Sequence, residues 1–108
     1  MKPLNVLITA ASRRVPLVNA FRAALARHGG GRVIVTDVNA LSPAVYSGDR
    51  AYRVPLTSDP GYLDEVLAIC VAERIGMLIP TIDDELPIFS AAVARFADEG
   101  VRVVVSPE

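Results

Sequence analysis

Short apolar runs alternate with longer amphipathic stretches along the whole chain. The apolar runs predict five strands, over residues 5–9, 32–37, 52–54, 77–80 and 101–105. The amphipathic stretches predict three helices between them, over residues 13–28, 59–75 and 83–100. Because helices of this length connect successive strands, we expect the strands to run parallel, with helices on both faces. The pattern therefore predicts a three-layer α/β domain with a mostly parallel sheet of about five strands in the order 3-2-1-4-5.

Polar residues that favour a helix start precede each predicted helix. The expected caps are Ser12, Asp59 and either Asp83 or Asp84. The spacing of apolar residues then predicts which face of each later helix is buried. The second helix is expected to bury Leu63, Val66, Leu67, Cys70 and Val71, and the third Leu86, Phe89, Ala92, Val93 and Phe96.

The composition narrows the class of protein. The chain has 108 residues, 52% of them hydrophobic, and a net charge of −1. We expect one folded domain over residues 1–108 that binds no nucleic acid and enters no membrane. No stretch resembles a signal peptide, so we expect a cytoplasmic protein. Because the chain stops directly behind its last predicted strand, we expect it to be part of a longer chain, with apolar surface that can pair two copies as a homodimer.

The single cysteine and the single histidine offer little chemistry. One of each cannot build a disulfide framework or a zinc cluster. Cys70 lies in an apolar helical stretch and is expected in the core. His28 precedes three glycines at a helix end, where it complements the helix dipole.

Three polar segments follow the carboxyl ends of predicted strands, over residues 10–14, 37–42 and 81–85. Parallel strands present these ends at one edge of the sheet, so we expect the three segments to converge on a ligand crevice there. Arg13 and Arg14 are unusual in this position, because cations are mildly unfavourable at a helix start. Beside free amides they suit an anion, although solvated side chains explain them equally well.

These segments also suggest two other classes of domain, for which the sequence evidence is weaker. Asp37, at the end of the second strand, would suit the ribose of a dinucleotide in a Rossmann domain, but the glycine fingerprint is missing from residues 10–14. Asp83 or Asp84 could stand for the phosphorylated aspartate of a response-regulator receiver. Ala10 and Ala11 occupy the positions where a receiver carries its acidic pair.

Four stretches together resemble the N-terminal (pre-ATP-grasp) domain of the ATP-grasp superfamily, whose fold is Rossmann-like. They cover residues 5–14, 35–44, 48–55 and 78–86 and read NVLITAASRR, VTDVNALSPA, GDRAYRVP and LIPTIDDEL. Each is moderately specific, and their order and spacing strengthen the likeness, which is greatest to carbamoyl-phosphate synthase large subunits and related carboxylate–amine ligases. The resemblance implies a substrate-side domain that is inactive alone, with ATP and magnesium bound by later ATP-grasp domains of the same chain and no cofactor on these residues.

The resemblance also implies a pocket for a small carboxylate or amine substrate, lined by the three polar segments. The predicted substrate-binding residues are Ala11, Ser12, Arg13, Arg14, Asp37, Asn39, Ser42, Asp83, Asp84 and Glu85. The first four would contact a carboxylate or phosphate, the next three a polar group, and the acidic three an amine. Helix caps and turns account for the same residues. The alternatives that remain open are a stand-alone nucleotide- or NAD-binding module and a non-catalytic interaction domain.

Overall fold

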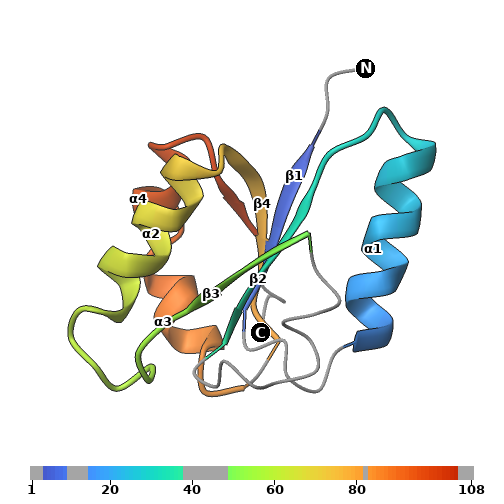
Figure 1. Ribbon diagram of the computed structural model, residues 1–108. Helices are drawn as coiled ribbons and strands as arrows, with labels where there is room; N and C mark the ends of the chain where they lie inside the picture. The colour runs from blue at the N-terminus through green and yellow to red at the C-terminus, as the bar shows by residue number, and fades with distance from the viewer. Residues whose placement is uncertain (1–3, 10–14, 38–48, 82, 105–108) are drawn as a thin grey trace.

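Five parallel strands form one sheet in the computed structural model, which describes residues 4–9, 15–37, 49–81 and 83–104 (Figure 1). They are β1 (Asn5–Ile8), β2 (Val33–Asp37), β3 (Arg50–Arg53), β4 (Ile75–Ile79) and β5 (Arg102–Val103). Their order is β3-β2-β1-β4-β5, and every neighbouring pair is parallel. The predicted α/β class and strand order are therefore confirmed.

Helices cover both faces of this sheet. One face carries α1 (Val15–Arg27) alone, and the other carries α2 (Tyr62–Ala72), α3 (Leu86–Ala91) and α4 (Val93–Ala97) (Figure 1). Since successive strand residues point to opposite faces, β1, β2, β3 and β4 each contribute to two cores. The α1 core contains Val6, Ile8, Val18, Leu25, Val33 and Val35. The larger core opposite includes Leu7, Ile34, Val66, Cys70, Leu78, Phe89 and Phe96.

The third predicted helix is divided in two. The backbone leaves helical geometry at Ala92, with φ −106° and ψ 6°, so α3 ends before it and α4 begins after it. Phe89, Ala92 and Phe96 all lie in the same core, so the apolar stripe continues across the break. Phe96 stays buried, but Val93, which was predicted to be buried, is 39% exposed.

The predicted starts of the second and third helices were also wrong, as was one of the five residues predicted on the buried face of α2. α2 begins at Tyr62, and Asp59 accepts a hydrogen bond from the Gly61 amide at 2.8 Å in the turn before it. α3 begins behind Glu85 without a side-chain cap, so neither Asp83 nor Asp84 caps it. Several polar and turn-forming residues precede each helix, and the sequence does not say which of them starts it.

α2 is apolar over much of its circumference, which explains the error in its predicted face. Its buried residues are Tyr62, Val66 and Cys70, four residues apart in sequence. Val71, predicted on this face, is 53% exposed. With apolar residues on several sides, spacing alone does not select the side that meets the sheet.

A buried acidic residue, Glu73, joins α2 to the amino ends of the strands. Its carboxylate accepts hydrogen bonds from Arg32 at 3.0 Å, from Arg50 at 2.9 Å and from the Tyr52 hydroxyl. The Tyr52 hydrogen bond holds the pKa of Glu73 below its ordinary value; burial opposes this shift, and Arg50 and Arg32 add to it. Asn5 donates to the Glu73 carbonyl at 2.9 Å, so β1, β2 and β3 all contact this residue.

Candidate functional site

The carboxyl ends of the parallel strands form the lower edge of the sheet in Figure 1, here called the carboxyl edge. Of the predicted site residues, the structure describes Asp37, Asp83, Asp84 and Glu85. The others, Ala11, Ser12, Arg13, Arg14, Asn39 and Ser42, lie outside the described residues. Substrate contact by any of the ten stays a prediction.

Glu85 is the most constrained of the described site residues. Its side chain is fully buried, and its Oε1 accepts hydrogen bonds from the Thr9 hydroxyl at 2.9 Å and from the Thr81 amide at 3.4 Å. Its Oε2 accepts a hydrogen bond from the Tyr62 hydroxyl at 2.5 Å. The Thr81 hydroxyl also donates to the Thr9 carbonyl at 2.7 Å. This Glu85 cluster, of Thr9, Tyr62, Thr81 and Glu85, brings the end of β1 against the segment after β4.

Tyr62 is held as a neutral hydrogen-bond donor within the cluster. Burial raises the pKa of its hydroxyl above the ordinary value of 10.0, because it disfavours the charged phenolate. The hydrogen bond to Glu85 and the negative charge of that carboxylate raise the pKa of Tyr62 further. Its ring also packs edge-on against Phe89, with ring centroids 6.0 Å apart. Tyr62 therefore joins the polar carboxyl edge to the hydrophobic core.

The remaining acidic residues differ in exposure. Asp37, the last residue of β2, is 5% exposed, and its carbonyl accepts the Val54 amide at 3.0 Å. Asp83 and Asp84 are exposed at the carboxyl edge and available to solutes. Among the described residues, no group of three or more His, Cys, Asp or Glu side chains is placed to hold a metal ion.

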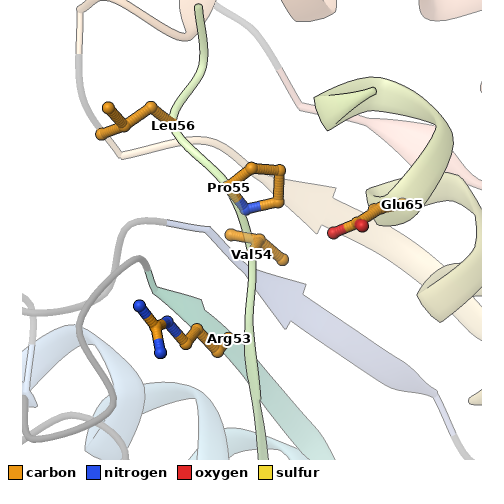
Figure 2. Close-up of a pocket in the computed structure, with 5 residues that line it drawn as sticks. All are labelled: Arg53, Val54, Pro55, Leu56 and Glu65. Atoms are coloured by element: carbon orange, nitrogen blue, oxygen red, sulfur yellow. The ribbon is translucent and has the colours of Figure 1, made fainter. Parts of the chain in front are cut away.

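Arg53 is a candidate that sequence reasoning missed. It ends β3 and is the register partner of Asp37 on the neighbouring strand, so it brings an exposed cation to the carboxyl edge. It also lines a surface hollow of about 480 Å³ with Val54, Pro55, Leu56 and Glu65 (Figure 2). Figure 2 shows the Arg53 side chain pointing away from α2, whereas Glu65 extends from α2 toward Pro55. No signal in the sequence singled it out, because Arg53 lies in the middle of the predicted strand over residues 52–54, whereas Asp37 ends its predicted strand.

Comparisons with known proteins agree with this architecture. A family model described as "PylC-like, N-terminal domain" matches residues 6–104. Among solved structures, the chain is similar to pyruvate carboxylase from Rhizobium etli, determined with the allosteric activator acetyl coenzyme A, with a TM-score of 0.60 and 21% identity. That alignment covers 95% of this chain and 10% of the pyruvate carboxylase chain, and at this identity it shows a shared fold.

No curated protein matches the chain significantly. In the described part of the chain, no helix is both long enough and apolar enough to cross a membrane.

The family match confirms the resemblance to N-terminal domains of ATP-grasp proteins, while the closer likeness to carbamoyl-phosphate synthase stays a prediction. Because the matched residues make up nearly the whole sequence, the chain belongs to the family of PylC-like N-terminal domains.

Proposed function

We propose that this chain is the substrate-side N-terminal domain of an ATP-dependent carboxylate–amine ligase. The observation that carries the proposal is the family match over residues 6–104. The polar carboxyl edge supports it, because ligands of open α/β sheets bind outside the carboxyl ends of the strands. The hydrogen-bonded contact between Thr9, Thr81 and Glu85 brings two of the three predicted substrate segments to neighbouring starting points.

The proposed reaction joins a carboxylate to a nitrogen nucleophile. ATP supplies the driving force by converting the carboxylate to an acyl phosphate, from which the nucleophile displaces inorganic phosphate. On this domain, arginine side chains bind the carboxylate, because a guanidinium matches its two oxygens. Arg53 is the described candidate for this contact, with Arg13 and Arg14 as the predicted ones. Asp83 and Asp84 are candidates to bind the ammonium group of the nucleophile before it loses its proton.

The nucleotide and its magnesium ions belong, in this proposal, to another part of the full-length gene product. The finer assignment, chemistry like that of carbamoyl-phosphate synthase, rests on the sequence resemblance alone.

The test is ADP release by the full-length gene product in the presence of ATP and magnesium. The twenty proteinogenic amino acids are supplied singly and in pairs, together with ammonium and bicarbonate as further probes. We expect at least one combination to release ADP at about 1 per second or faster, well above a reaction without acceptor. A product peak with the mass of the joined substrates less water completes the assignment.

The competing function is a module that binds NAD. Asp37, at the end of β2, favours it, because a carboxylate there can bind the ribose of a dinucleotide. Calorimetric titration with NAD distinguishes this function from the ligase function. Micromolar NAD binding without ADP release in any combination would replace the ligase assignment with this one.

A further inference from the structure

No cationic side chain in the described part of the chain pairs with the buried Glu85 carboxylate. The four ion pairs among the described residues join Arg22 to Asp49, Arg32 and Arg50 to Glu73, and Arg95 to Asp64. Glu85 is in none of them, and its partners are two hydroxyls and one amide. Burying a carboxylate is costly, and an apolar residue of similar volume often serves stability as well or better. Stability alone therefore does not explain an acid at this position.

The partners of Glu85 come from three separate elements. Thr9 directly follows β1 and lies 76 residues away in sequence, Tyr62 begins α2, and Thr81 follows β4 by two residues. Both Glu85 oxygens are used, so one side chain fixes the ends of two neighbouring strands and the start of a helix. Direct contact between Thr81 and the Thr9 carbonyl closes the arrangement on the sheet side.

We propose that Glu85 is a positioning residue: its buried carboxylate fixes the carboxyl ends of β1 and β4 relative to each other and to α2, and so sets where the two substrate-binding segments leave the sheet. Its role in substrate binding rests on the proposed ligase function. Residues 10–14 continue directly from Thr9, and Asp83 and Asp84 lie between Thr81 and Glu85. In this proposal Glu85 acts through these segments, in place of the direct contact with a substrate amine that was predicted from the sequence.

The chain offers a contrast within the same fold. Glu73 is also a buried acid that joins several elements, but it lies at the amino ends of the strands and is paired with two arginines. Its contacts hold the sheet together at the edge away from the proposed site. Glu85 makes its contacts at the edge from which the predicted substrate segments depart. A misplacement of about 1 Å in such segments is enough to lower the efficiency of an enzyme substantially.

The test compares three variants of the full-length gene product. Glu85→Leu removes the acceptor at similar volume, and Glu85→Gln keeps one oxygen, which can still accept from Thr9 and Thr81. Glu99→Gln makes the same carboxylate-to-amide change at an exposed position and serves as the control. Kinetics use ATP and the carboxylate that gives the fastest ADP release in the panel above. Hydrogen–deuterium exchange of peptides containing Thr9 and Thr81 supplies a readout that needs no activity.

For Glu85→Leu we expect KM for the carboxylate to rise about tenfold or more while KM for ATP stays close to that of the unmodified protein. Glu85→Gln should recover most of this loss, and Glu99→Gln should change neither KM. Partial unfolding would instead lower the apparent kcat with both KM values unchanged, because the molecules that stay folded bind normally. A Glu85→Leu protein with both KM values unchanged overturns the proposal.

The exchange experiment separates failure of this inference from failure of the ligase assignment. We expect the peptides containing Thr9 and Thr81 to exchange about tenfold faster in Glu85→Leu, with β2 peptides unaffected. If the unmodified protein releases no ADP with any probe, the ligase assignment fails, and exchange alone decides whether Glu85 fixes the strand ends. Unchanged exchange in the peptides that contain Thr9 and Thr81 refutes the proposal that Glu85 fixes the strand ends. Should Glu85→Leu be insoluble, Thr9→Val removes one donor and must give the same pattern at Thr81.

Discussion

Replacing Glu73 by glutamine tests how the amino ends of the strands are held. The Glu73 carboxylate is 3% exposed and accepts hydrogen bonds from Arg32, Arg50 and Tyr52. Glutamine keeps the shape but removes the negative charge and turns one acceptor into a donor. Arg50 and Tyr52 of β3, an edge strand, both donate to the same oxygen of this carboxylate, so the change weakens the contacts that hold β3.

The expected loss of free energy of unfolding depends on how exposed the two arginine partners of Glu73 are. Removing one partner of a fully buried ion pair costs about 3–5 kcal/mol, because the remaining charge is left without solvent. Here the arginine side chains are 46% and 57% exposed, so water replaces the lost acceptor. We therefore expect the free energy of unfolding of Glu73→Gln to fall by about 1–3 kcal/mol. For a domain of this size that lowers Tm by about 4–8 °C for each kcal/mol.

The pH dependence of this loss gives the sharper test. The pKa of Glu73 in the folded protein lies below its ordinary value of 4.5, so its charged form stabilises the fold at every pH above that value. This contribution disappears as the pH falls through the folded pKa and the carboxylate takes up a proton. Urea unfolding at a series of pH values should show a constant difference between the two proteins from pH 7 to about pH 5, which then shrinks toward zero.

Two results would refute this reasoning. A difference that persists unchanged at pH 3 would mean that the charge of Glu73 is not what stabilises the sheet. Equal stability at pH 7 would mean that the three hydrogen bonds contribute nothing net. Glu99→Gln, at an exposed carboxylate, is the control and should show no difference at either pH.

Three further predictions concern separate parts of the molecule. Burial raises the pKa of the Cys70 thiol to about 12. Its labelling by a disulfide reagent at pH 8 should therefore be at least about 100-fold slower than in urea-unfolded protein. Equal labelling rates would contradict its place in the core. Gly31→Ala places a Cβ 1.8 Å from the Leu4 carbonyl oxygen and should cost more than about 3 kcal/mol in urea unfolding. In the matched change Gly30→Ala, the added Cβ meets no atom within 4 Å, so only the positive φ at this position should cost free energy of unfolding, about 1–2 kcal/mol. Equal losses in the two variants would show that the contact with Leu4 does not matter. Arg53→Ala should raise KM for the carboxylate about tenfold in the ADP-release assay with Tm unchanged, and an unchanged KM would remove Arg53 from the site.

The sheet was predictable because its signals are local. The run Val33-Ile34-Val35 lies between a cluster of glycines and Asp37, so it marks a buried strand in the sequence itself. Strand order followed from the alternation of strands and helices, since right-handed crossovers leave few arrangements. Helix boundaries were less certain, because the break at Ala92 lies inside an apolar run with no proline or glycine at the break itself.

The burial of the acidic residues Glu73 and Glu85 was not predictable from the sequence. Glu73 accepts hydrogen bonds from Arg32, which precedes β2, and from Arg50 of β3, and Glu85 accepts one from Thr9, 76 residues away. Local sequence does not specify such partners, and an acid at either end of a helix is ordinarily solvated. Sequence reasoning predicted Glu85 as a substrate-binding residue from its position after a strand, but did not predict that its carboxylate accepts hydrogen bonds from groups of the protein itself.

The central place of β1 has a consequence for how the domain forms. β1 is synthesised first, yet it pairs with β2 on one side and on the other with β4, which lies far along the chain, so that Val6 meets Met77. Such long-range pairings slow folding, because loop closure must precede any gain from the contact. A nascent chain that ends before β4 exposes one edge of its middle strand, which is open to pairing with other chains. Folding of this domain is therefore a late event in its translation, and the unfinished chain is the form that most needs a chaperone.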